Sequence, residues 1–436
     1  MLQLFGSGLL SLWLDMAGVK SPKFDPIEAL SLQSSPSLVL APDRTPVGAT
    51  VVQQYIEQLK AAGRVEANQG VWIQSGPILL ANHQGTVPLP AASLTKIATS
   101  LAALKTWGPE YQFQTLVSAT GPIKNGVLQG DLVIQAGGDP FFVWEEAIAL
   151  GNSLQAMGIS RVTGNLIVSG NFVMNYKFNP IASGELLKQA LNAANWSQLI
   201  ENQYLTLPQG TPRPQVAIAG SVQLATINNP KQILLLRHRS LPLAQILKEM
   251  NVYSNNEMAE MLAYNLGGVQ VVRSKAATTA GVPIAEIELV NGSGLGMGNR
   301  ISPRAACAML MAIQRQLSPY QLTVADLFPV SGRDRRGTLL TRQIPLHTVI
   351  KTGTLNEVSA LAGVMPTRDR GLVWFAAING GSDIERFRQG QDRLLQNLLQ
   401  QLQVAPNLPA AITPSSLQDT PAPLGAASRN EIMYKG

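Results

Sequence analysis

The sequence is poor in cysteine, histidine and charged residues. It has 436 residues and one cysteine, Cys307, so no disulfide can form within the chain and no cysteine-rich zinc site can be built. The three histidines, His83, His238 and His347, lie far apart in the sequence, which argues against a metal centre. Charged residues make up 14%, and the net charge of +6 is spread thinly, without a basic stripe. We therefore predict no metal and no nucleic-acid partner.

Hydrophobic residues, by contrast, make up 45% of the chain. This composition excludes a disordered polyelectrolyte and a charged coiled coil. At about 150 residues per domain, the length predicts two or three globular domains.

The two ends differ from the rest of the chain. The apolar run 2–14 is shorter than the roughly 20 residues that span a bilayer. It has the length of a signal h-region, although no Lys or Arg precedes it and no small-x-small cleavage site follows before Lys20. A helix docked on the body or lying at a membrane surface fits equally well, so residues 1–25 are interpreted as a signal or an anchor. Residues 405–436, rich in Pro, Ala, Ser and Thr, predict a disordered tail.

Between the ends, the hydrophobic periodicity changes twice. Helical spacing at 51–64 and 93–107 gives way to period-two patterning at 113–137, with a turn around Asn125-Gly126, and to further strands up to about His238. Helical spacing then returns from Leu241. The last patterns are three strands and a helix, at 346–353, 358–365, 372–379 and about 385–402. This order predicts an α/β (α+β) catalytic domain, 26–112 and 238–404, interrupted by a β-rich inserted domain, 113–237.

Ser93-Leu94-Thr95-Lys96 is the first candidate for chemistry. Ser93 opens an apolar-periodic run, so it should lie in the first turn of a helix, where the dipole favours developing negative charge. Three residues on, Lys96 shares the helix face with Ser93, and burial would lower its pKa enough for it to act as a base. An N-cap serine with a solvated lysine fits the same four residues.

Ser254-Asn255-Asn256 is the second candidate, at the start of another helical run. A hydroxyl and a carboxamide two residues apart can point into one cleft, where the hydroxyl relays a proton and the amide holds a peptide carbonyl. Ser and Asn are also ordinary N-caps, and Tyr253-Ser254-Asn255 offers a competing register.

Lys351-Thr352-Gly353-Thr354 is the third candidate, at the end of a predicted strand. A glycine inside a strand pattern marks a close backbone approach, here by a ligand lying along an edge strand. A peptide that pairs with such an edge is oriented by main-chain hydrogen bonds.

In this order and in these structural contexts, the three motifs are typical of serine penicillin-recognising enzymes. From about Leu30 to about Leu402 the chain resembles the D-alanyl-D-alanine carboxypeptidase/endopeptidases of the class C low-molecular-mass penicillin-binding proteins. The similarity extends to four further stretches: Gly137-Gly138-Asp139-Pro140, 238–262, Asn291-Gly292-Ser293-Gly294-Leu295 and Gly337-Thr338-Leu339. In this family the second motif precedes an Ala-Glu pair, here Ala259-Glu260, which favours the Ser254/Asn256 register.

The resemblance implies an antiparallel sheet flanked by helices, with a large insertion between the first and second motifs. The chain departs from the family at Asn291, where Asp is usual, and at Ser169-Gly170-Asn171, where an acidic residue is common. These departures concern loop geometry and leave the catalytic set intact. We interpret Ser293 as part of a loop, and Arg333, Arg335 and Arg336 as solvated surface.

The resemblance also implies acyl transfer on peptidoglycan stem peptides, with β-lactams as covalent inhibitors. Ser93 would attack the penultimate D-alanine carbonyl, Lys96 would accept its proton, and the N–H groups of Ser93 and Thr354 would hold the oxyanion. Water would hydrolyse the acyl-enzyme, so no cofactor is needed. The remaining implied roles are proton transfer to the leaving amine by Ser254 and Lys351, substrate amide binding by Asn256, and carboxylate binding along Thr352, Gly353 and Thr354.

Two alternatives share these motifs. A β-lactamase or esterase can be built on the same fold, although the Glu-x-x-Leu-Asn element of class A β-lactamases is absent. A silent wall-binding protein would have no chemical reason to keep Ser93, Lys96, Ser254, Asn256 and Lys351 together.

Because peptidoglycan lies outside the cytoplasmic membrane, we expect a periplasmic or extracytoplasmic location, with membrane association through residues 2–14. We also expect Lys96 to be buried with a lowered pKa, and Lys351, on the strand edge, to stay charged.

Overall fold

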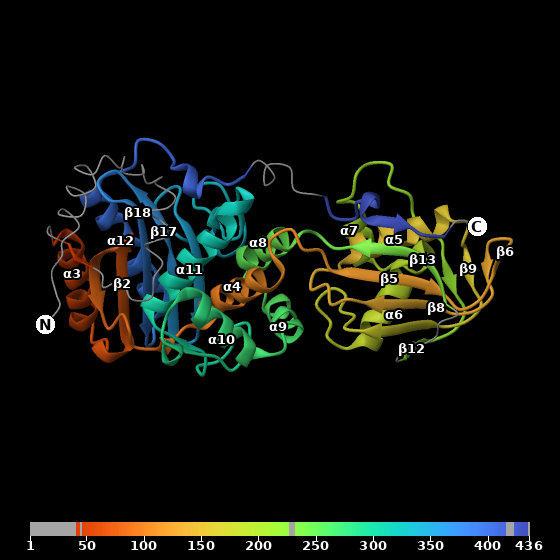
Figure 1. The fold of residues 1–436 in the computed structure, drawn as a ribbon, viewed down its shortest axis with the longest axis horizontal. Helices are drawn as coiled ribbons and strands as arrows, with labels where there is room; N and C mark the ends of the chain where they lie inside the picture. Colours follow the sequence, from red (N-terminus) through yellow and green to blue (C-terminus); the bar gives the residue numbers. More distant parts are fainter. Residues whose placement is uncertain (1–40, 44–45, 226–231, 416–422, 435–436) are drawn as a thin grey trace, which may run out of the picture.

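The protein has two lobes, each built around its own sheet and its own hydrophobic core (Figure 1). The computed structural model describes residues 41–43, 46–225, 232–415 and 423–434. The N-terminal segment 1–25, interpreted above as a signal or an anchor, lies outside the described residues. No helix in these ranges combines the length and the apolar character needed to cross a bilayer.

The sheet of the first lobe has six strands, ordered β1-β3-β2-β18-β17-β16. Their bounds are β1 (Ala41–Pro42), β2 (Gln69–Ser75), β3 (Ile78–His83), β16 (Val349–Leu355), β17 (Val358–Thr367) and β18 (Gly371–Gly380). Every neighbouring pair is antiparallel except β1 and β3, which run parallel at one edge. At the other edge is β16, the strand that carries Lys351. The predicted antiparallel sheet is therefore present, and its edge strand bears the third motif.

Helices cover both faces of this sheet (Figure 1). On one face lie α3 (Val47–Ala61) and α12 (Ile384–Leu402), and on the other lie α4 (Thr95–Trp107) and α11 (Pro303–Leu317). All ten residues of β17 are consequently buried, and alternate side chains enter the two cores. Among the described residues, this lobe also contains α8 (Leu243–Tyr253), α9 (Asn256–Asn265) and α10 (Val269–Ala280). A small sheet joins β4 (Leu89–Pro90), β15 (Arg300–Ile301) and β14 (Ile287–Glu288).

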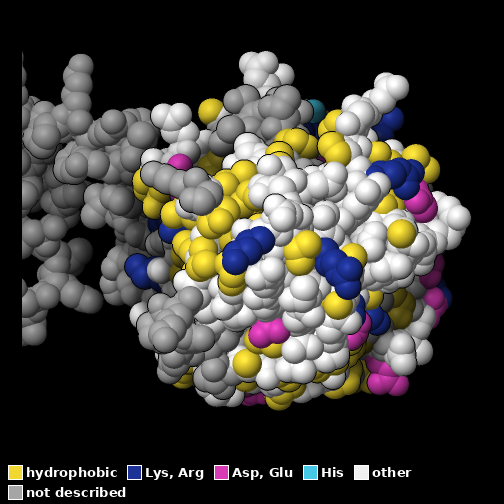
Figure 2. Space-filling view, turned by 90° about the vertical axis from the view of Figure 1, so that its right-hand side faces the viewer, with side chains coloured by type: hydrophobic (Ala, Val, Ile, Leu, Met, Phe, Trp, Pro, Cys, Tyr) yellow, Lys and Arg dark blue, Asp and Glu magenta, His cyan; other side chains and the backbone are white. Residues whose placement is uncertain are grey.

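The second lobe contains a mixed six-stranded sheet, ordered β12-β10-β8-β5-β13-β19. Its strands are β5 (Gln114–Ala119), β8 (Leu132–Ala136), β10 (Leu166–Gly170), β12 (Val222–Leu224), β13 (Ile233–Arg239) and β19 (Asn430–Ile432). Its helices are α5 (Trp144–Ala156), α6 (Pro180–Ala190) and α7 (Gln198–Tyr204). None of the described strands between 114 and 239 joins the sheet of the first lobe. On the end face of this lobe, Lys and Arg side chains are interspersed with hydrophobic and acidic ones (Figure 2).

The hairpin predicted at 113–137 consists of two nested pairs. The outer strands, β5 and β8, pair antiparallel in the large sheet. The inner strands, β6 (Ile123–Lys124) and β7 (Val127–Leu128), pair around Asn125-Gly126 and join β9 (Arg161–Val162) and β11 (Ala217–Ile218) in a four-stranded sheet. Asn125 and Gly126 both have positive φ, 48° and 80°, as a tight two-residue hairpin turn requires.

The prediction of a disordered tail at 405–436 is wrong for the described residues of that segment. Ile412 is fully buried in the first lobe, and β19 pairs antiparallel with β13 in the second. The segment lacks a periodic pattern because it builds no core of its own. It adds one strand to an existing sheet edge and inserts a few anchoring side chains. The second lobe therefore includes residues beyond the predicted range 113–237, namely the end of β13 and the strand β19.

The anchors of β19 are polar and buried. The guanidinium of Arg429 forms an ion pair with the carboxylate of Glu146 on α5, and its Nη1 donates to the Pro423 carbonyl at 2.8 Å. The amide of Asn430 contacts Nδ1 of His238 at 2.7 Å and donates to Oγ of Ser153 at 3.0 Å. Burial raises the pKa of the Glu146 carboxyl, and the charge of Arg429 opposes this rise. Each group of the ion pair therefore depends on the other.

We expect Arg429→Ala to lower the free energy of unfolding of the second lobe by about 3–5 kcal/mol, because it leaves Glu146 buried without its counter-charge. Denaturant unfolding followed by circular dichroism measures this. Glu431→Gln is the matched control, because Glu431 forms exposed pairs with Arg237 and Arg239 that should contribute about 1 kcal/mol or less. Equal destabilisation by the two variants would contradict the assigned role of Arg429.

Candidate active site

Ser93 lies in a short 3-10 turn, η2 (Ala92–Leu94), directly before α4. The preceding residue, Ala92, is fully buried and has a φ of 47°, a left-handed conformation that is costly for a residue with a Cβ atom. The turn is held by hydrogen bonds from Ala91 N to the Asn299 carbonyl, 2.8 Å, and from Leu94 N to the Ala91 carbonyl, 3.1 Å. The nucleophile candidate thus precedes the α-helix on a constrained turn.

Lys96, in the first turn of α4, is fully buried beside Ser93. Its Nζ contacts three oxygens: Oγ of Ser93 at 3.0 Å, Oδ1 of Asn256 at 2.8 Å and the carbonyl of Ser293 at 2.7 Å. Burial lowers the pKa of Lys96 from 10.5 to about 7, although the charges of Glu260 and Glu257 oppose this shift. A substantial fraction of Lys96 is therefore a neutral amine near neutral pH.

The three contacts determine how a neutral Lys96 is oriented. A neutral amine has two N–H bonds and one lone pair. The amide oxygen of Asn256 and the carbonyl of Ser293 can only accept hydrogen bonds, so they take the two N–H groups. The lone pair then faces the Ser93 hydroxyl, as a general base requires.

The second motif lies in the connection between α8 and α9. Ser254 has a φ of 55° and ends α8, and Asn256 is the first residue of α9. Asn255 caps α9, since its Oδ1 accepts from the backbone N–H of Met258 at 2.8 Å. Ser254 contacts Lys351 and Asn256 contacts Lys96. Tyr253 instead lies at the surface, where its side chain is 53% exposed and its ring lies under the guanidinium of Arg336. The structure therefore favours the Ser254/Asn256 register.

Lys351 differs from expectation in its burial. Although β16 is an edge strand, the Lys351 side chain is fully buried, and its Nζ donates to Oγ of Ser254 at 2.9 Å and to the Thr352 carbonyl at 2.6 Å. Burial, and secondarily the charge of nearby Lys96, lowers the pKa of Lys351 well below its usual value. The expectation that Lys351 stays charged because it lies on a strand edge is therefore not supported, since the edge strand is covered at this point and its side chain is buried.

Gly353 permits a close approach of β16 to the nucleophile turn. A Cβ atom on this residue would lie 2.9 Å from the Ala91 carbonyl oxygen and 3.0 Å from the Ser93 nitrogen. Any side chain would push the strand away from Ser93. The glycine thus brings the backbone around Thr354 next to the backbone of Ser93.

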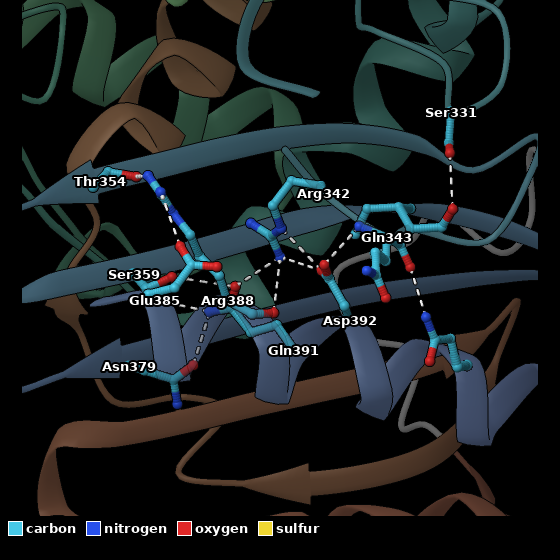
Figure 3. A network of polar contacts seen from close by, with 12 residues as sticks. Ser331, Arg342, Gln343, Thr354, Ser359, Asn379, Glu385, Arg388, Gln391 and Asp392 are labelled. Carbon is cyan, nitrogen blue, oxygen red and sulfur yellow. Dashed lines mark hydrogen bonds and ion pairs between the residues drawn. The ribbon is translucent and has the colours of Figure 1, made fainter. Parts of the chain in front are cut away.

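Side chains on neighbouring elements hold the two threonines of β16. Oγ1 of Thr352 donates to Oγ1 of Thr338 at 2.8 Å, and Arg388 on α12 donates to Oγ1 of Thr354 at 3.0 Å. Figure 3 shows Arg388 within a polar network that also includes the buried Arg342–Asp392 ion pair, with a contact of 2.6 Å. Sequence reasoning missed Arg388, because no spacing rule links a residue of the last helix to the third motif.

The remaining sequence candidates have structural roles. Ser293 contacts Lys96 through its carbonyl and not through its hydroxyl. Asn291 shapes the same loop, since its Oδ1 accepts from Gly294 N at 2.8 Å. Arg336 pairs with Glu249 at 2.6 Å on the surface, in agreement with a solvated role. Within the described ranges, no cluster of three or more His, Cys, Asp or Glu side chains could hold a metal ion.

Together, this geometry places a serine hydroxyl beside a buried lysine amine that could accept its proton, which is the arrangement that serine acyl transfer requires. Among curated proteins, the chain is 23% identical to D-alanyl-D-alanine carboxypeptidase DacB of Haemophilus influenzae, over 70% of this chain and 83% of that protein. It is 24% identical to a D-alanyl-D-alanine carboxypeptidase of Actinomadura sp. (strain R39), over 76% of this chain and 80% of that protein.

Solved structures share the fold. A predatory endopeptidase of Bdellovibrio bacteriovorus in complex with its immunity protein matches with a TM-score of 0.67 and 20% identity, covering 83% of this chain and 98% of that one. Penicillin-binding protein 4 (dacB) of Haemophilus influenzae matches with a TM-score of 0.60 and 21% identity, and the match covers 80% of this chain and 99% of that one. The penicillin-recognising fold predicted above is confirmed.

The family assignment follows from the sequence itself. The D-Ala-D-Ala carboxypeptidase 3 (S13) family matches residues 52–175 and 209–401, and the chain belongs to this family. The prediction of a serine-type D-alanyl-D-alanine carboxypeptidase is therefore confirmed at the level of family and enzyme class.

Proposed function

We propose that the protein hydrolyses the terminal D-Ala-D-Ala bond of peptidoglycan stem peptides through an acyl-enzyme on Ser93, and that β-lactams acylate the same serine. The proposal rests above all on the contacts of Lys96, which leave its lone pair directed at the Ser93 hydroxyl. The reaction needs no cofactor, because nucleophile, base and proton relay are all side chains of this chain.

In the acylation step, Oγ of Ser93 attacks the carbonyl carbon of the penultimate D-alanine, and its proton moves to Nζ of Lys96. The N–H groups of Ser93 and Thr354 stabilise the oxyanion of the tetrahedral intermediate. The close approach that Gly353 allows supports this pairing of donors.

The C–N bond then breaks, and the leaving amine of the terminal D-alanine takes a proton through Ser254 and Lys351, which are 2.9 Å apart. Asn256 holds the substrate amide, while Thr352 and Thr354 bind the terminal carboxylate along Gly353. Finally, water attacks the ester carbonyl, the Ser93 ester bond breaks, and a proton returns to Oγ.

Cleavage of peptide cross-bridges is the second candidate function, because it uses the same acyl-enzyme and the solved relatives include endopeptidases by name.

Since the substrate is assembled outside the cytoplasmic membrane, we also propose a periplasmic or extracytoplasmic location. Membrane association through residues 2–14 stays a prediction. We further propose that the two lobes are separate domains, because each has its own sheet and its own core.

Digestion of purified peptidoglycan, with products identified by mass spectrometry, tests the proposal. Release of free D-alanine from pentapeptides is expected, and conversion of cross-linked dimers to monomers would identify endopeptidase activity. Ser93→Ala protein serves as the control. Rapid turnover of penicillin without any product from peptidoglycan would instead indicate a β-lactamase, and no labelling by a fluorescent penicillin would indicate a silent wall-binding protein.

A further inference from the structure

The carboxylate of Glu260, on α9, holds the loop that contacts the base lysine. Its two oxygens accept separate backbone hydrogen bonds: Oε2 from Gly292 N at 3.1 Å and Oε1 from Ser293 N at 2.9 Å. Charge-assisted hydrogen bonds of this kind are stronger than neutral ones and fix the acceptor in two directions. The backbone of the loop at Ser293 is thereby tied to α9.

The same loop is the third contact of Lys96. The Ser293 carbonyl accepts from Lys96 Nζ at 2.7 Å, which is the shortest of the three Nζ contacts given above. A second tie comes from α4, where Oγ1 of Thr99 donates to the Gly292 carbonyl at 2.7 Å. At Gly292 the loop lies directly on α9, since a Cβ atom there would be 2.5 Å from Cβ of Ala263. A shift of this loop would move an acceptor of the base.

One helix therefore controls two of the three Nζ contacts. Asn256 and Glu260 are four residues apart, so they share a face of α9. Asn256 contacts Lys96 directly, and Glu260 acts through Ser293. Both contacts are needed to occupy the two N–H bonds of the neutral amine and so to leave its lone pair toward Ser93.

We propose that Glu260 is a positioning residue for acylation, which orients Lys96 by clamping the Gly292–Ser293 backbone and which supplies a negative charge close to the base. This role rests on the proposed function of Lys96 as the base toward Ser93. The sequence marks Glu260 only as part of the Ala-Glu pair that follows the second motif, and no spacing rule assigns it a contact with residue 293.

The charge of Glu260 gives the proposal a pH signature. Lys96 is approached by Glu260 and Glu257 from α9, which both raise its pKa against burial, and Lys351 faces it from β16. Protonated Lys96 cannot accept the Ser93 proton, so acylation should rise with pH through the Lys96 pKa of about 7. Removing the negative charge of Glu260 lowers that pKa, and the acid limb of the profile should move to lower pH.

Glu260→Gln tests both parts of the role, with second-order acylation by a fluorescent penicillin measured from pH 5 to pH 10. An amide retains one acceptor but faces the other backbone N–H with an NH2 group, so the clamp is broken. We expect the limiting rate at high pH to fall about 10- to 100-fold, as for other small misplacements of a catalytic group. We also expect the midpoint of the acid limb to lie at lower pH than in the unchanged protein.

Glu257→Gln is the matched control. Glu257 lies on the same helix and is exposed. Its charge raises the pKa of Lys96 less than the charge of Glu260 does. This variant should shift the midpoint less and leave the limiting rate within about twofold, because it breaks no clamp. Glu260→Asp, which keeps the charge on a shorter side chain, should lose rate while its midpoint stays close to that of the unchanged protein.

Two results would overturn the proposal: a limiting rate for Glu260→Gln equal to that of Glu257→Gln, or a loss of rate in a folded Glu260→Gln protein with no shift of the midpoint. The second result would mean that Glu260 only supports the fold of the loop. A failure of the proposed function is separate and visible first, because in that case the unchanged protein would not be acylated at Ser93 at any pH.

Discussion

Ser93→Ala is expected to abolish acylation by penicillin, with a loss on the order of a million-fold in rate, because it removes the oxygen that forms the ester. The only structural cost is the hydrogen bond to Lys96, about 1 kcal/mol, so the protein should stay folded. Labelling with a fluorescent penicillin followed by peptide mapping measures the first effect, and thermal unfolding measures the second.

Ser254 makes this experiment informative, because its surroundings resemble those of Ser93. Oγ of Ser254 lies 2.9 Å from Nζ of Lys351, and Oγ of Ser93 lies 3.0 Å from Nζ of Lys96. Two features favour Ser93: the constrained turn on which it sits, and the close approach of β16 at Gly353. Ser254→Ala should therefore still become labelled, although more slowly. A labelled peptide containing Ser254 in the Ser93→Ala protein would overturn the assignment.

The local parts of the site could be predicted from the sequence because the reactive groups sit on short motifs. Three-residue spacing on a helix brings Lys96 to Ser93, and a glycine in a strand pattern marks the approach at Gly353. The order of the elements likewise predicted the strands β16 to β18 and the last helix to within a few residues. These features depend on local propensity and on hydrophobic periodicity.

The parts that could not be predicted depend on contacts between distant segments. Burial of Lys351 results from the α8–α9 connection that covers an edge strand, which the sequence of the strand does not encode. The role of Glu260 comes from its contact with the backbone of Ser293, 33 positions away in the sequence. The role of Arg388 comes from its contact with the Thr354 side chain, 34 positions away. The docking of β19 depends on single polar anchors such as Arg429, which no periodicity reveals.

Lys96→Arg is expected to lose nearly all acylation, at least about 10²- to 10⁴-fold, because a guanidinium does not deprotonate in the working pH range and so cannot act as the base. The loss of acylation should persist at pH 10, because arginine stays protonated there. A variant whose base merely had a raised pKa would regain acylation at that pH. The reason lies in the site: burial brings the pKa of Lys96 to about 7, and its two other acceptors reserve the lone pair for Ser93. Acylation rates of Lys96→Arg across this pH range, with folding checked by circular dichroism, measure the effect.

Lys351→Arg is the comparison that separates the roles of the two lysines. Arginine keeps a hydrogen-bond donor toward Ser254, so the loss of acylation should be smaller than for Lys96→Arg. Some loss is expected even so, because the fully buried Lys351 side chain leaves little room for a larger planar group. If Lys96 is the base and Lys351 acts through Ser254, only Lys351→Arg retains measurable labelling. Equal impairment of two folded variants, or recovery of Lys96→Arg at high pH, would show that this division between the lysines is wrong.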